Sequence, residues 1–335
     1  MKLFVLTFLF LLSICTKVSA QDDPSKTAKA FIQQGDYNNA LVVLNRAIQN
    51  DKNNVELRND LAFTYYLQRD FVKAMATGKE LVDGKDGDVQ SYQILGMVYK
   101  AIENRGEAEN LYRSALKKFP ESGVLYNEYG ELIASGNNQK DAIKLWQKGI
   151  QLDANYSGNY YNAAKYYLES TDRVWGLIYG EIFINLESYS KRTPEIKSLL
   201  LEGYKKLFAE TDMTKNQDVK NDFVRQYLIT MKNQSPVVSA GITPDALTAL
   251  RTRFVLEWFS KPGTPIPFRL FDYQKQLARE GIFDAYNQWI FGAASDLTAF
   301  QQWTATHSDE YSRFNTFQKN RVFKLPQGQY YQSTK

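Results

Sequence analysis

Small and large apolar positions recur along the first half of the chain with a period of 34 residues. One set of positions, 34 residues apart, holds only small residues: Ala40, Ala74, Ala108, Ala142 and Gly176. A second small residue lies twelve positions before each of these, at Ala28, Ala62, Gly96, Gly130 and Ala164. Large residues follow three positions after the second set, at Phe31, Tyr65, Tyr99, Ile133 and Tyr167. A fixed period of this length predicts stacked structural repeats.

The residue types predict two antiparallel helices in each repeat. Helices approach closely only where a small side chain lies at the crossing, and a large neighbour one turn away fills the remaining space. Turn or cap residues separate the two helices at 34–37, 68–71 and 135–138, and Pro120 follows a segment where a helix should end. The predicted repeats are residues 21–54, 55–88, 89–122, 123–156 and 157–190.

The second half remains helical but loses the period. Thr193-Pro194-Glu195 and Thr243-Pro244-Asp245 each begin a helix, because a capping hydroxyl precedes a proline and an acid. Further helices are predicted at 195–210, 217–231, 245–260, 269–279, 282–292, 297–306 and 310–320. The proline-rich segment 261–267 is predicted to be a loop, residues 191–325 an aromatic-rich helical region, and residues 326–335 a flexible tail.

The repeats resemble the tetratricopeptide repeat (TPR) family. The third repeat matches the family pattern through Tyr92, Leu95, Gly96, Tyr99, Ala108, Tyr112, Ala115 and Pro120. Gly78 in the second repeat and Phe183 in the fifth depart from it. The resemblance covers about half the chain and implies a right-handed helical solenoid whose concave face binds peptides or proteins, without catalysis.

The concave face implied by the resemblance is formed by the first helix of each repeat, at its fifth and ninth positions. These positions hold Asn59, Phe63, Gln93, Met97, Asn127, Glu131, Tyr161 and Lys165. The strip is largely neutral and rich in amides, so we expect it to bind a peptide backbone and apolar side chains rather than a terminal carboxylate. Alternatively, these residues cover a groove that another part of the same chain occupies.

The first twenty residues have the order of a secretory signal peptide. Lys2 precedes an apolar stretch from Leu3 to Ile14, and Val18-Ser19-Ala20 supplies small residues before a polar segment. We expect cleavage after Ala20 and export to the periplasm of a Gram-negative bacterium. The segment before Cys15 resembles a lipobox, but Ile14 stands where a small residue is needed, so lipidation is not expected.

Composition excludes several kinds of chemistry. The chain has one cysteine, one histidine and a net charge of +4, with 41 basic and 37 acidic residues. One Cys and one His cannot provide a zinc or iron–sulfur ligand set, and the small mixed charge does not indicate nucleic-acid binding. Glu280 and Asp284 lie one helical turn apart, which is more typical of a solvated face than of a hydrolase pair. We therefore expect no enzymatic activity, cofactor, metal or membrane span in the mature chain.

Three functions remain compatible with the sequence, one of them a structural role in which the C-terminal region docks in the solenoid and the protein acts by self-association. The first is an exported scaffold that binds a protein or peptide as an accessory part of a cell-envelope assembly. The alternative is a glycan-binding or carbohydrate-active envelope protein that uses the C-terminal aromatic residues, with Trp258, Trp289 and Trp303 as the tryptophans available for stacking.

Overall fold

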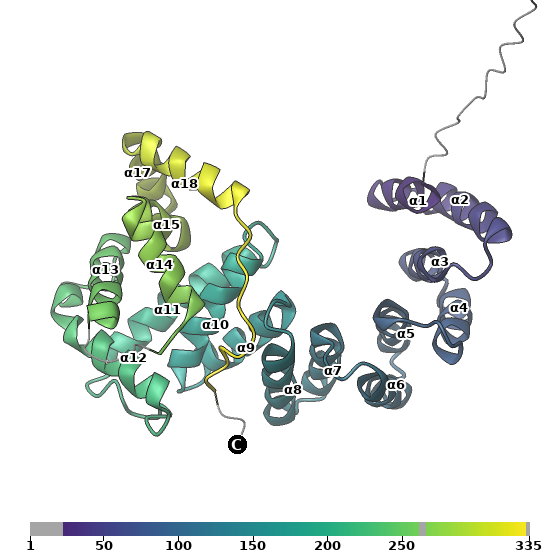
Figure 1. Ribbon diagram of the computed structural model, residues 1–335, viewed down its shortest axis with the longest axis horizontal. Coiled ribbons are helices and arrows are strands. Elements are labelled where there is room, and N and C mark those ends of the chain that lie inside the picture. Colours follow the sequence, from purple (N-terminus) through teal and green to yellow (C-terminus); the bar gives the residue numbers. More distant parts are fainter. Residues whose placement is uncertain (1–22, 261–265, 333–335) are drawn as a thin grey trace, which may run out of the picture. The chain divides into compact units, whose positions relative to one another are not determined.

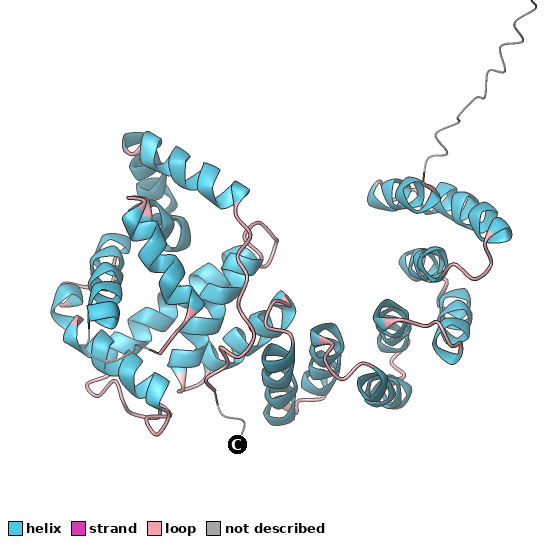
Figure 2. Cartoon of the chain, in the orientation of Figure 1, coloured by secondary structure: helices cyan, strands magenta, loops and turns pink. Residues whose placement is uncertain are grey.

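A computed structural model describes residues 23–260 and 266–332, and every regular element in these ranges is helical (Figure 2). The described chain divides into two compact units, residues 23–94 and 95–332. Each unit is described by itself below. The predicted signal peptide and most of the predicted 261–267 loop lie outside the described residues. None of the described helices is long and apolar enough to span a bilayer.

The first unit is built from consecutive antiparallel helix pairs. Its helices are α1 (Pro24–Gln33), α2 (Tyr37–Asn50), α3 (Val55–Leu67), α4 (Phe71–Asp83) and the first part of α5 (Val89–Ala101) (Figure 1). Side chains of Asp23, Asp36, Asn54 and Asp70 cap the first four helices by accepting a backbone N–H. These caps satisfy donors that have no partner within the helix, so they fix where each helix begins.

The same backbone conformation recurs in four successive turns between paired helices. Gly35, Arg69, Glu103 and Asn137, which are 34 residues apart, have φ values of 76°, 62°, 58° and 61°. This left-handed conformation ends one helix and directs the chain into the next. Only the first of these four positions is a glycine, so the backbone conformation follows the 34-residue period more regularly than the residue types do.

The second unit continues the pairs and then adds the C-terminal region. Its repeat helices after α5 are α6 (Arg105–Lys118), α7 (Gly123–Ser135), α8 (Gln139–Leu152), α9 (Ser157–Glu169) and α10 (Arg173–Leu186). The small residues Ala40, Ala74, Ala108 and Ala142 are fully buried across the two units. The close helix crossings predicted from their spacing are therefore confirmed.

Glycine at position 176 has a direct steric cause. A Cβ added there would lie 2.7 Å from the backbone nitrogen of Leu168, in the neighbouring helix α9. In the same helix as Gly176, Phe183 is fully buried, where the family pattern has a small residue. Its ring lies 5.3 Å from that of Tyr161, between centroids. The fifth repeat is therefore a helix pair, whose second helix carries larger side chains because it packs against the C-terminal region.

The C-terminal region consists of further α-helices and two short segments of other helix types. They are α11 (Thr193–Ala209), α12 (Asp222–Asn233), η1 (Ser235–Val238), α13 (Pro244–Ser260), α14 (Arg269–Arg279), α15 (Phe283–Asn287), the π-helical η2 (Gln288–Gly292), α16 (Ala293–Ser295), α17 (Leu297–Thr306) and α18 (Ser308–Asn320). The helix predicted at 217–231 begins later, because Asn221 caps it and the Gln217 side chain instead contacts Val174 and Thr171.

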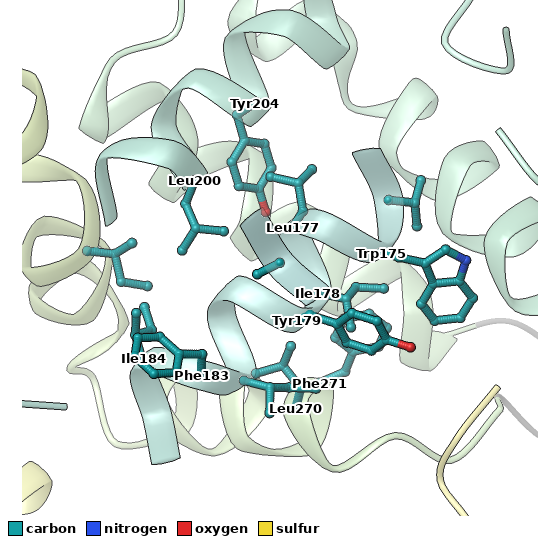
Figure 3. Packing of buried hydrophobic residues seen from close by; sticks show 14 of the residues in the cluster. Trp175, Leu177, Ile178, Tyr179, Phe183, Ile184, Leu200, Tyr204, Leu270 and Phe271 are labelled. Carbon is teal, nitrogen blue, oxygen red and sulfur yellow. The ribbon is translucent and has the colours of Figure 1, made fainter. Parts of the chain in front are cut away.

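Helix α10 lies at the centre of the second unit's core. Trp175, Ile178 and Phe183 are at most 2% exposed, and side chains of α11 and α14 pack around them (Figure 3). The C-terminal aromatics are mostly part of this core. Trp258 is fully buried and Trp289 is 8% exposed, so neither can stack on a glycan.

A buried ion pair connects α10 to α13. Arg251 donates to Glu181, and the two residues are 1% and 4% exposed. Gln274 and Tyr286 also donate to the same carboxylate oxygen, each at 2.8 Å. Arg251 donates further to Asn287. Such a pair is tolerated in a core only when the surrounding hydrogen bonds satisfy it, as they do here.

The prediction of a flexible tail from residue 326 is wrong for residues 326–332, which pack against the second unit. Gln332 accepts from the Tyr179 hydroxyl at 2.6 Å and donates to Tyr167 at 2.8 Å. The Tyr331 ring stacks on Phe223, with centroids 5.1 Å apart. The segment forms no helix, as its sequence indicates, but hydrogen bonds and aromatic contacts hold it in place. Residues 333–335 lie outside the described range.

Candidate functional site

The candidate site is a surface formed in the second unit by α7 and α9, the first helices of two consecutive pairs, and by α11. Helix α7 contacts α9, and α9 contacts α11. Four of the predicted residues lie here: Asn127 and Glu131 on α7, and Tyr161 and Lys165 on α9. We call this the α7–α9–α11 surface. The register of the repeats therefore does bring these four side chains onto neighbouring helices.

On α7 the polar side chains are held by one another. The Asn127 amide donates to Glu131 at 3.0 Å, and the Asn162 amide donates to Asn127 at 2.9 Å and to Glu131 at 3.2 Å. Lys100 lies 2.5 Å from Glu128 and 3.8 Å from Glu131. Asn127 is 4% exposed, so it supports this network more than it contacts solvent.

On α9, Tyr161 and Lys165 converge on an acid from α11. The Tyr161 hydroxyl donates to Glu195 at 2.5 Å, and the Lys165 ammonium lies 2.7 Å from the same carboxylate. These two hydrogen bonds, that of Lys165 first, lower the pKa of Glu195. The Arg192 guanidinium lies 4.6 Å from the Tyr161 ring centroid and pairs with Glu187 at 2.6 Å. The ring is therefore fixed in place by cationic groups and an acid.

Two cavities open beside Glu131. One has a volume of about 510 Å³ and lies between α7, α8 and α9, where Trp146, Lys165 and Glu169 line it. The other, of about 560 Å³, is lined by Lys100, Arg105 and Glu131, among others. Each is large enough to admit side chains of a bound partner. The surface is thus hollowed where the predicted residues gather.

The remaining predicted residues have other surroundings. Asn59 is fully buried in the first unit, where its amide donates to Asp88 at 3.0 Å and its oxygen accepts from Ser91 at 2.8 Å. Phe63 is half-buried and stacks on Tyr66, with centroids 6.2 Å apart. Gln93 in the first unit and Met97 in the second are half-buried. Asn59 therefore has a structural role, and its prediction as a partner-binding residue is wrong.

The α7–α9–α11 surface carries more charged groups than the predicted strip, because residues outside the predicted positions contribute to it. Ion pairs dominate it, and most of their members lie outside the fifth and ninth helix positions. Residues missed by that register are Lys100, Glu128, Asn162, Arg192 and Glu195. Glu195 was visible in the sequence only as part of a helix start. Its contact with Lys165 depends on how α11 packs on α9.

The C-terminal region offers little surface for glycan stacking. Trp303 is the remaining candidate, since it is half-exposed, and its ring lies 4.4 Å from that of His307 in parallel stacking. Asp284 accepts from Thr248 at 3.0 Å, and burial raises its pKa. Within residues 23–260 and 266–332, no cluster of three or more His, Cys, Asp or Glu side chains could hold a metal.

Comparisons with known proteins agree with the repeat pattern. Residues 28–68 match a family model described as TPR repeat, and residues 95–160 match one described as tetratricopeptide repeat. No curated protein matches the chain. Two similar solved structures are TTC0263, a thermophilic TPR protein in Thermus thermophilus, and MamA. The first is 18% identical, with a TM-score of 0.46, and the match covers 53% of this chain and 97% of that one. The second is 20% identical, with a TM-score of 0.38, covering 48% and 94%.

Proposed function

We propose that this tetratricopeptide-repeat protein is an exported scaffold that binds a protein or peptide through its α7–α9–α11 surface. Two stretches of the chain match TPR models, and repeats of this type generally mediate protein–protein interaction without catalysis. The order of charged, apolar and small residues in the first twenty positions supports export. These two features together support the proposal of an accessory role in a cell-envelope assembly.

One observation carries the choice of surface. Tyr161 and Lys165 are held on α9 by Glu195, yet neither is fully buried. Side chains that are already fixed lose little conformational entropy when a partner binds. Aromatic groups are also enriched at the centres of protein interfaces. The surface therefore combines preorganised groups with two adjoining cavities.

Affinity capture with matched variants tests this proposal. The tagged chain would be captured from cells that produce it naturally, once as wild type and once with Tyr161→Ala and Lys165→Ala. The control carries Lys144→Ala and Lys148→Ala, which change exposed residues of α8. We expect a protein that wild type and control recover equally and that the Tyr161/Lys165 variant recovers several-fold less. Equal recovery by all three would contradict the surface assignment.

Export has a separate test. N-terminal sequencing of the protein from the periplasmic fraction should give Gln21 as the first residue. Protein that stays in the cytoplasm with Met1 or Lys2 at its start would contradict export but leave the binding surface untouched.

A further inference from the structure

The cavity of about 510 Å³ between α7, α8 and α9 has a rigid aromatic floor. Trp146 from α8 is 4% exposed, and its indole N–H donates to the Asn127 carbonyl at 3.4 Å. The ring packs directly on Gly130, where an added Cβ would lie 2.3 Å from the indole nitrogen. Tyr166 from α9 adds a second ring to the lining. Flat aromatic walls of this kind suit an aliphatic stem or a planar cation.

Carboxylates line the same cavity. Glu131 comes from α7 and Glu169 from the last turn of α9. The Glu169 side chain is exposed, and its carboxylate makes no hydrogen bond or ion pair within residues 23–260 and 266–332. The one cation in the lining, Lys165, is already paired with Glu195 at 2.7 Å. The cavity therefore has a free negative charge and no free positive one.

The wider surroundings are acidic as well. Four acids, Glu128, Glu131, Glu169 and Glu195, face two lysines, Lys100 and Lys165, which leaves a net charge of −2. The pKa of a neighbouring tyrosine, Tyr156, reflects this negative charge. Burial is the main cause that raises the pKa of Tyr156 to about 12, and the charges of Glu128 and Glu131 raise it further. A cation entering this region would gain electrostatically, whereas an anion would be repelled.

We propose that this cavity binds a basic side chain of the partner, with arginine preferred over lysine. The aliphatic stem would lie against Trp146 and Tyr166, and the guanidinium would reach Glu131 and Glu169. Arginine is favoured because its planar group can stack on a ring while it pairs with a carboxylate through two hydrogen bonds. This inference rests on the proposed function, since it assigns the chemistry of one contact on the α7–α9–α11 surface.

Titration with small amides tests the site in the full-length protein. The probes are N-acetyl-arginine amide, N-acetyl-norleucine amide, which has an uncharged stem, and N-acetyl-glutamate amide. Binding is followed by NMR at the Trp146 indole N–H, which is assigned by its loss in Trp146→Phe. We expect the arginine probe to bind with a Kd in the millimolar range, as a small ligand should, and more weakly as salt rises.

Charge-neutralising variants then locate the contact. Glu169→Gln should raise the Kd of the arginine probe about three- to tenfold without affecting folding, because Glu169 is exposed. Glu202→Gln, an exposed residue on α11, is the matched control and should leave Kd unchanged. Equal binding of the norleucine or glutamate probe, or an unchanged Kd in Glu169→Gln, would overturn the inference.

The two proposals can fail separately. If the Tyr161/Lys165 variant loses a partner in affinity capture but the arginine probe has the same Kd for wild type and Glu169→Gln, the binding surface is supported and the arginine site is wrong. If the probe binds as expected but the variant recovers every protein equally, the cavity binds cations and the proposed scaffold function of the surface is wrong.

Discussion

Replacing Glu181 by glutamine removes one charge from the buried pair that joins α10 to α13 while it keeps the side chain's size. The Arg251 guanidinium, which is 1% exposed, then has no anion beside it. Breaking a buried pair on one side costs about 3–5 kcal/mol. Two effects reduce that cost. The amide oxygen still accepts hydrogen bonds, and the Phe283, Tyr286 and Phe291 rings lie 5.3–5.6 Å from the guanidinium carbon. We expect a net loss of about 2–4 kcal/mol in the free energy of unfolding.

Urea unfolding followed by tryptophan fluorescence measures this loss selectively. All five tryptophans of the chain lie between residues 146 and 303, so their signal reports the second unit. Adding Arg251→Met to Glu181→Gln removes the unpaired cation and should restore at least half of the lost stability. A loss below about 1 kcal/mol for the single variant would refute the reasoning, as would a double variant no more stable than the single one.

Three further predictions concern other parts of the structure. Arg69 has φ 62°, a left-handed conformation that is unfavourable for any residue with a Cβ. Arg69→Gly should therefore stabilise the first unit by about 0.5–1 kcal/mol in thermal unfolding, whereas Arg69→Ala should give no gain. The Leu325 amide, just before the C-terminal segment 326–332, should be protected in hydrogen exchange by its bond to Asn155 at 2.9 Å, and Asn155→Ala should abolish that protection. Rapid exchange at Leu325 in the wild type would contradict this contact. Burial lowers the pKa of Lys197 to about 7 from 10.5, so the unfolded chain holds more protons above pH 7. The free energy of unfolding of the wild type, measured relative to that of Lys197→Met, should therefore rise by about 1 kcal/mol or more as the pH is raised from neutral into the alkaline range. A difference between the two proteins that does not change with pH would contradict the lowered pKa of Lys197.

The repeats could be predicted from sequence because their signal is local and repeated. Each Ala or Gly at the 34-residue spacing lies at a helix crossing, and capping side chains such as Asp36 and Asp70 fix the helix starts. Pairwise packing between sequence neighbours translates this pattern directly into structure. The same reasoning placed Asn127, Glu131, Tyr161 and Lys165 on adjacent helices.

The chemistry of the surface could not be predicted in the same way. Glu195 reaches Lys165 because α11, which lies outside the period, packs on α9. The docking of residues 326–332 depends on Tyr167 and Tyr179, which Gln332 contacts across separations of 165 and 153 positions. Helix periodicity carries no information about such distant contacts. For the same reason, the burial of Trp258 and Trp289 was not visible in the aromatic-rich sequence.

In-cell photo-crosslinking shows whether the α7–α9–α11 surface contacts a protein partner. A photoreactive amino acid would replace Tyr161 or Tyr166 on this surface, or Lys144 or Lys148 on α8 as controls, with the adducts identified by mass spectrometry. We predict that positions 161 and 166 form adducts with the same protein and that positions 144 and 148 do not. Adducts of equal yield from all four positions, or none from 161 and 166, would show that this surface does not bind the partner.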